Sequence, residues 1–97
     1  MASAGPVIWG GDWNHALDGR EYAGSTAGRA AILELVASRG LKVVTAAEPH
    51  ATDGLLSIDH IAVPASWGVE SSRRVIAVAG GRRLSDHDAY VAEAAAP

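Results

Sequence analysis

The sequence has 97 residues, which is enough for one folded domain and too few for two. We therefore interpret residues 1–97 as one structural unit or as part of one. Hydrophobic residues make up 48% of the chain and charged residues 20%, a balance that is typical of a globular protein and disfavours disorder. The net charge of -3 gives no general attraction to nucleic acid or anionic lipid. Because the chain has no cysteine, disulfides, thiolate zinc sites and cysteine nucleophiles are excluded.

Two further features concern membranes and targeting. The apolar runs are only a few residues long, far below the roughly 20 residues of a membrane-spanning helix. The N-terminal MASAGP lacks the basic start and the apolar core of a signal peptide. The sequence therefore predicts no membrane span and, by default, a cytoplasmic location.

The first part of the sequence predicts a strand, a loop and a helix. Residues 6–11 (PVIWGG) contain β-branched and aromatic side chains and end in two glycines, which indicates a strand followed by a break. Residues 18–25 (DGREYAGS) are typical of a loop. Ser25 or Thr26 predicts the cap of a helix that runs to about Arg39. The apolar face of this helix is expected to contain Ile32, Leu35 and Val36.

Two strands are predicted after this helix. Gly40 followed by an apolar residue suits a left-handed helix stop. Residues 41–46 (LKVVTA) then predict a strand, and a polar loop follows it. Residues 56–64 (LSIDHIAVP) alternate well enough to predict another strand, which the final proline ends.

The last third of the sequence is interpreted as a connector and two strands. Residues 65–72 are the connector, and residues 74–79 (RVIAVA) predict a strand. Residues 80–83 (GGRR) predict a turn, and residues 88–94 (DAYVAEA) the last strand. The order of a strand, a helix and four strands predicts an α/β protein of the α+β type, mostly antiparallel with one main helix.

Asp12 and Asn14 lie two residues apart where the first predicted strand ends. In extended backbone both side chains point to the same side. A carboxylate in this place holds a metal or orients a water, and an amide donates a hydrogen bond to a charged oxygen. The alternative is a turn in which these residues bond their own backbone, and the pair taken alone favours that turn.

Asp59 and His60 lie inside the strand predicted over residues 56–64. A carboxylate buried there needs a partner, so a partner is expected unless Asp59 lies on a solvated face. His60 points to the opposite face of the strand in the absence of a bulge. We therefore expect His60 to be a surface or packed imidazole and not a group of the same site.

The segment LSDHDAYV is dense in titratable groups at the junction between a turn and a strand. Asp86, His87 and Asp88 are expected to converge there. His87 exchanges protons near neutral pH, and a carboxylate bonded to one ring nitrogen would fix its tautomer and favour its charged form. Asp59 is a candidate for that carboxylate. The alternative for SDH taken alone is a capped turn with solvated acids.

The other histidines and the serines lack the sequence patterns of known metal or catalytic sites. The histidines His15, His50 and His60 lack the spacing of a structural zinc site. No serine lies in the GxSxG context of an esterase. The tryptophans are expected to lie in the core or in a cleft wall, with Trp13 placed between two candidate site residues.

Three segments, taken in order, resemble the motifs of one known family. GDWN at residues 11–14 is similar to the GDxN motif of the endonuclease/exonuclease/phosphatase superfamily, which has the DNase I-like fold. SIDHI at residues 57–61 is similar to its IDxI strand, and LSDHDAYV at residues 84–91 is similar to its terminal SDHxxV motif. Each motif is weak alone, whereas the ordered set is strong. The resemblance covers residues 6–91 and implies the second half of a four-layer α/β sandwich.

The resemblance implies a role for each matching residue in cleaving a phosphate ester of a nucleic acid, phospholipid or small molecule. Asp12 would orient or activate the attacking water, and Asn14 would bond to the phosphoryl oxygens. Asp86 would help to bind the divalent cation, with Mg²⁺ or Mn²⁺ favoured over zinc because the ligands are oxygens. His87 would contact the phosphate and act in proton transfer or charge stabilisation, held in orientation by Asp59.

The sequence lacks a counterpart of the family's front half, which supplies an Asn and a metal-binding Glu. The glutamates present are in other contexts: Glu21, Glu34, Glu48, Glu70 and Glu93. The first hypothesis is a truncated or split phosphoesterase that works with a complementary N-terminal half. The second is an inactive half-domain that acts as an interaction or dimerisation module through an exposed apolar sheet face. A nucleic-acid binder ranks last, with support only from Arg20, Arg73, Arg74, Arg82 and Arg83.

Overall fold

The computed structural model describes residues 6–97, which contain one helix and several antiparallel strand pairs. Residues 1–5, which carry most of the expectation about a signal peptide, lie outside the described residues. The strands β1 (Trp9–Asp12), β2 (Leu41–Val43) and β3 (Asp59–Pro64) form a sheet in the order β1-β3-β2, and both of its pairs are antiparallel. The predicted α+β class with mostly antiparallel strands is confirmed. Within the described part, no helix has the length and apolarity that crossing a membrane requires.

Three predicted strands are shorter in the structure. The strand expected over residues 6–11 begins only at Trp9 and continues through the two glycines that were expected to end it. The strand expected over residues 41–46 ends at Val43, because residues 44–47 form a turn. In this turn the Thr45 hydroxyl accepts a hydrogen bond from the backbone N–H of Ile61 at 3.0 Å, which takes the place of a strand partner. The strand expected from residue 56 begins only at Asp59.

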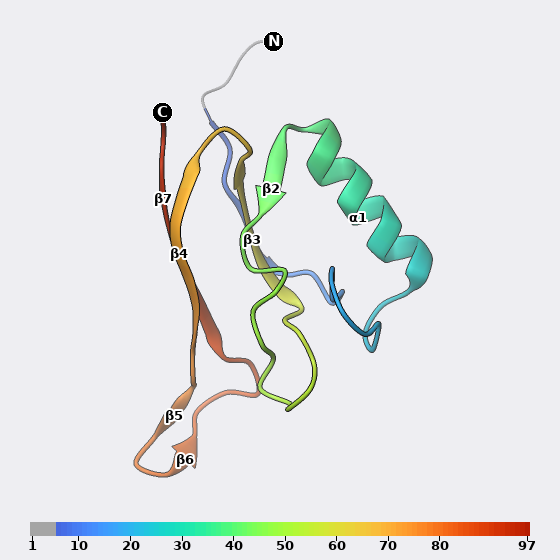
Figure 1. The fold of residues 1–97 in the computed structure, drawn as a ribbon. Coiled ribbons are helices and arrows are strands. Elements are labelled where there is room, and N and C mark those ends of the chain that lie inside the picture. The colour runs from blue at the N-terminus through green and yellow to red at the C-terminus, as the bar shows by residue number, and fades with distance from the viewer. Residues whose placement is uncertain (1–5) are drawn as a thin grey trace.

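The helix α1 (Thr26–Ser38) begins and ends as the sequence predicts. Ser25 is the N-cap, and its hydroxyl accepts a hydrogen bond from the backbone N–H of Gly28 at 2.9 Å. Gly40 has a φ of 65°, the left-handed stop that only glycine adopts without strain. The predicted apolar face is only partly buried: Val36 lies in the core, whereas Leu35 is 42% exposed. Figure 1 shows α1 beside β2, on the opposite side of the sheet from β4 and β7.

His15 ties the loop before α1 to the start of the helix. Its Nδ1 lies 2.8 Å from the carbonyl oxygen of Trp13, and its Nε2 accepts a hydrogen bond from the backbone N–H of Ser25 at 3.2 Å. A neutral ring with its proton on Nδ1 makes both bonds. The ring lies so close to α1 that a Cβ added at Gly28 would be 2.2 Å from His15 Nε2. A side chain at this helical position would therefore have to displace the imidazole beside it.

Replacing Gly28 with alanine should lower the free energy of unfolding by about 1 kcal/mol. Alanine in a helix normally gains about 1 kcal/mol over glycine, but the new methyl group would displace the His15 ring and break two hydrogen bonds, each worth about 1 kcal/mol. Urea unfolding measures the change. In a His15→Ala background the same substitution should become stabilising. A stabilising Gly28→Ala in the wild-type background would contradict the contact.

A two-stranded antiparallel ribbon is formed by β4 (Gly68–Val75) and β7 (Ala89–Ala95). The interpretation of residues 65–72 as a connector is therefore wrong. This segment gives no apolar alternation because most of β4 is exposed and its polar side chains meet solvent, while the backbone pairs with β7. The pairing is irregular between Val69 and Ser71, where the register shifts.

A short hairpin extends the other end of this ribbon (Figure 1). It consists of β5 (Val78–Ala79) and β6 (Arg82–Arg83), so the strand predicted over residues 74–79 is divided between β4 and β5. The turn predicted over residues 80–83 is confirmed at its two glycines, whereas its two arginines form β6. Gly80 and Gly81 have φ values of 58° and 74°, and this pair of left-handed residues makes the tight turn that joins twisted strands.

The apolar core of the described residues is small. It consists of Ala16, Leu17, Val36, Ile58, Ala62 and Val63. Several large apolar side chains are exposed, among them Ile8 and Leu33. An open apolar groove lies between α1 and the first strands, lined by Val7, Trp9, Leu35, Arg39 and Leu41. The core thus holds the three-stranded sheet and α1 together and leaves the strand ends open to solvent.

Candidate active site

The register of β1 and β3 places two carboxylates side by side. Asp12 is the last residue of β1 and Asp59 the first residue of β3, and the two are partners across the antiparallel pair. Their side chains are 42% and 20% exposed. Like charges in opposed positions destabilise a strand pair. This end of the sheet therefore favours a positive group between the two carboxylates.

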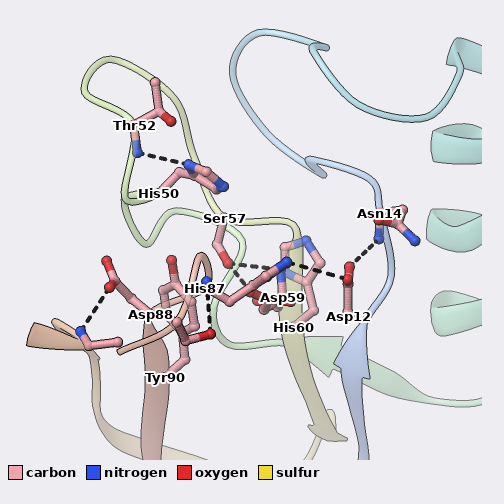
Figure 2. A network of polar contacts seen from close by, with 12 residues as sticks. Asp12, Asn14, His50, Thr52, Ser57, Asp59, His60, His87, Asp88 and Tyr90 are labelled. Atoms are coloured by element: carbon pink, nitrogen blue, oxygen red, sulfur yellow. Dashed lines mark hydrogen bonds and ion pairs between the residues drawn. The ribbon is translucent and has the colours of Figure 1, made fainter. Parts of the chain in front are cut away.

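His87 supplies that group from a distant part of the chain (Figure 2). Its Nδ1 lies 2.6 Å from Asp59 Oδ2, and its Nε2 lies 3.7 Å from Asp12 Oδ2. The predicted contact between Asp59 and His87 is therefore present. Because the Nδ1–H donates to Asp59, Nε2 is the ring nitrogen that faces Asp12. The ligand atoms of the three residues lie within 4.8 Å of one another.

The loop that carries His87 is held in place by its neighbour Asp88. The Asp88 side chain is 1% exposed, and its Oδ1 accepts hydrogen bonds from the backbone N–H of Ala77 at 2.9 Å and from Arg83 Nη1 at 3.0 Å. Arg74 Nε lies 3.7 Å from Oδ2. The Ala77 N–H, followed by the two guanidinium groups, holds the pKa of Asp88 below its ordinary value against the opposing effect of burial. Asp88 is thus a structural anchor. It lines the same open depression as His87, as the sequence suggests, but its carboxylate is directed to Ala77 and the arginines, and Asp86 is not part of that lining.

Asp12 is fixed by the turn that follows β1. Its Oδ1 accepts a hydrogen bond from the backbone N–H of Asn14 at 2.9 Å, and Asn14 is left-handed with a φ of 52°. This is the turn that the alternative interpretation of the segment describes. The expectation that both side chains point to the same side is wrong, because extended backbone ends at Asp12. Figure 2 shows Asn14 on the far side of Asp12 from His87, while Asp12 Oδ2 remains directed to the imidazole.

Asp59 raises the pKa of His87 above its ordinary value, first through the hydrogen bond to Nδ1 and then through its charge, with smaller contributions from the charges of Asp12 and Asp86. The imidazolium form therefore persists to higher pH than in a free histidine. Since the pKa of the folded state lies above the unfolded value of about 6.5, the contact stabilises the fold fully below that pH. The stabilisation is lost as the pH rises through the pKa of the folded state.

Replacing Asp59 with asparagine should lower the pKa of His87 toward about 6.5, because the amide carries no charge to stabilise the imidazolium. NMR titration of the His87 ring protons measures this pKa. Asp53→Asn, which removes an exposed carboxylate from a loop, is the matched control and should leave the pKa of His87 unchanged. An unshifted pKa in Asp59→Asn would show that the contact is absent in solution.

His60 lies on the other face of β3, as the sequence predicts, and is 1% exposed. Its Nε2 lies 2.8 Å from the carbonyl oxygen of His15, and its Nδ1 lies 3.2 Å from the Thr45 hydroxyl. Burial lowers the pKa of His60, partly opposed by the hydrogen bond to His15 and by the charge of Asp59. The Trp13 ring packs against His60 with centroids 5.2 Å apart. His60 therefore supports the strand from behind and is a packed imidazole.

The expected cation ligand, Asp86, is exposed and directly precedes His87. Within residues 6–97, Asp86 does not belong to the one group of three acidic or imidazole side chains whose ligand atoms converge, namely Asp12, Asp59 and His87. That group contains an imidazole nitrogen, whereas Mg²⁺ prefers an octahedron of oxygen ligands. The convergent group therefore fits Mg²⁺ poorly.

An open depression lies against this group, and its lining includes Gly11, Asp12, Asp59, His87 and Tyr90. The sequence interpretation did not single out Tyr90, whose hydroxyl donates a hydrogen bond to the carbonyl oxygen of Pro49 at 2.6 Å. Its position in DAYV, inside a predicted strand that begins beside His87, is the signal that could have found it. The depression leaves the side chains of Asp12 and His87 accessible to a solute. Comparisons of the chain with models of protein families, with curated proteins and with solved structures find no match.

Proposed function

We propose that Asp12, His87 and Asp59 form the reaction centre of a metal-dependent phosphoesterase of the endonuclease/exonuclease/phosphatase type. The observation that carries this proposal is an imidazole held between two carboxylates at the ends of adjacent strands, next to an open depression. The order of the GDWN, SIDHI and LSDHD motifs supports it. The substrate is a phosphodiester or phosphomonoester.

Hydrolysis assigns different tasks to the three side chains. Asp12 orients a water and accepts its proton as the water oxygen attacks phosphorus. Protonated His87 donates from Nε2 to a phosphoryl or leaving oxygen, where negative charge grows as the ester bond breaks. Asp59 is a positioning residue, because its hydrogen bond fixes the ring and favours the imidazolium. Neutralising the phosphoryl oxygens is the chemistry that a bound Mg²⁺ or Mn²⁺ would supply.

We assign the cation to Asp86 together with ligands from outside these 97 residues. A single carboxylate plus substrate oxygens is a common way of binding Mg²⁺, but it gives low affinity until a second carboxylate joins it. A complementary half of a four-layer sandwich, packed on the exposed apolar side chains of this half, would supply that second ligand. Asn14 would bond to the phosphoryl oxygens only after its side chain turns toward His87, since the turn directs it elsewhere.

Hydrolysis of bis(4-nitrophenyl) phosphate and of 4-nitrophenyl phosphate, with millimolar Mg²⁺ or with EDTA, tests the proposal. Turnover should be slow, should require the cation, and should be lost in Asp12→Ala because no carboxylate then orients the water. Asp53→Ala, an exposed carboxylate outside the depression, should keep full turnover. Turnover that survives Asp12→Ala, or that persists in EDTA, would contradict the proposal.

A further inference from the structure

The donor set around His87 suits a different cation from Mg²⁺. We infer that His87 Nε2 and Asp12 Oδ2 form a binding site for Zn²⁺ or a similar late first-row divalent ion such as Co²⁺. An imidazole nitrogen and a carboxylate oxygen are the ligands that these ions accept together, and hard cations favour oxygens alone. The site needs no cysteine and differs in both residues and geometry from a structural zinc site.

His87 is oriented as a metal-binding histidine is. Its Nδ1 is engaged by Asp59 Oδ2 at 2.6 Å, so the lone pair available to a cation is the one on Nε2. A carboxylate on the remote ring nitrogen is the usual partner of a metal-bound histidine, since it fixes the tautomer and raises the basicity of the coordinating nitrogen. Asp59 is therefore a positioning residue for this cation.

Asp12 supplies the second ligand at a suitable distance. Its Oδ2 lies 3.7 Å from His87 Nε2, too far for a hydrogen bond. Two ligands at zinc bond lengths in a tetrahedral arrangement lie about 3.4 Å apart, so a shift of a few tenths of an ångström brings both onto one ion. The hydrogen bond from Asn14 N–H holds Asp12 Oδ1 and leaves Oδ2 free to face the imidazole.

The remaining coordination positions would be filled by water. His87 and Asp12 are 37% and 42% exposed, and the open depression lies directly beside them. Two protein ligands bind less tightly than the four of a structural site, and the positions left to water make this an open site. The charge is also favourable, because Asp12 and Asp59 bring two negative charges to a place that holds one imidazole.

Calorimetric titration of the protein with ZnCl₂ in the absence of substrate, together with the visible absorption of added Co²⁺, tests this site. One ion should bind per chain. His87→Asn and Asp12→Asn should each weaken binding by more than about tenfold, and Asp59→Asn by about 10- to 100-fold, as expected for loss of the carboxylate behind a metal-bound histidine. NMR of the His87 ring nitrogens should show the perturbation on Nε2 and not on Nδ1.

His50→Asn is the matched control, because His50 is a partly exposed histidine of the loop before β3 that lies outside the depression. It should bind Zn²⁺ as the wild type does. Equal affinity in His87→Asn and wild type, or loss of binding in His50→Asn, would overturn the inference. Displacement of Zn²⁺ by an equal concentration of Mg²⁺ would overturn it as well. Zinc binding is measured without turnover, so its failure is distinct from failure of the proposed hydrolysis.

Discussion

Replacing His87 with asparagine should lower the Mg²⁺-supported rate of phosphodiester hydrolysis by about 10²- to 10⁴-fold, the usual contribution of a positioned acid or base. Asparagine fills a similar space but neither carries a positive charge nor releases a proton to the substrate. The measured quantity is kcat at saturating cation. His50→Asn should retain the wild-type rate. A His87→Asn variant that keeps its circular dichroism spectrum and its rate would show that the imidazole takes no part in the reaction.

The pH dependence separates the role of the imidazolium from a purely structural role. The rate should fall as the pH rises through the raised pKa of His87, because only the protonated ring donates from Nε2. In Asp59→Asn this fall should move to lower pH by the same amount as the NMR pKa of His87. A positioning role of Asp59 predicts this joint movement. If the pH at which the rate falls stays the same while the NMR pKa of His87 moves, a group other than His87 controls the rate.

The sequence was sufficient for the parts of the fold that local chemistry controls. Ser25 and Gly40 mark the ends of α1 because capping and left-handed backbone are properties of single residues. The contact between Asp59 and His87 was also predictable, since a carboxylate in a strand needs a partner and the histidine needs a carboxylate to hold its charge. His60 on the opposite face follows from strand alternation.

The predictions that were wrong concern features that depend on pairing between distant segments of the chain. The strand β4 carries few apolar residues because most of it is exposed, so only its hydrogen bonds to β7 reveal it as a strand. The position of Asp12 beside Asp59 is set by the register of β1 on β3, which no single segment contains. The prediction that Asn14 and Asp12 point to the same side rested on extended backbone continuing past Asp12. The left-handed backbone of Asn14 ends the strand there instead.

Asp86 and Asp88 show the same limit within three residues. Both are aspartates next to His87, and nothing in the sequence distinguishes the exposed one from the buried one. Burial separates them: the Asp88 side chain is 1% exposed and is surrounded by Ala77 N–H and two arginines, whereas Asp86 meets solvent. The different environments predict a large loss of stability from substitution of Asp88 and almost none from the same substitution of Asp86.

Replacing Asp88 with alanine should lower the free energy of unfolding by about 2–3 kcal/mol. It removes a buried carboxylate, leaves the Ala77 N–H and the Arg83 guanidinium without their acceptor, and removes the ion pair with Arg74. The value lies below that of a fully buried pair because the Arg74 and Arg83 side chains are 25% and 39% exposed. Urea unfolding provides the measurement. Asp86→Ala, the matched control one position before His87, should change stability by no more than about 0.5 kcal/mol.

The acid side of the stability curve provides an independent check on Asp88. Its pKa is held below the ordinary value, so its stabilisation is complete above the unfolded pKa of about 3.9 and is lost as the pH falls through the pKa of the folded state. Asp88→Ala should therefore lose less stability than the wild type between neutral and strongly acid pH. The anchor also positions His87, so the same variant should lower the pKa of His87 as the loop moves from Asp59. Equal acid sensitivity in both proteins would contradict this role of Asp88.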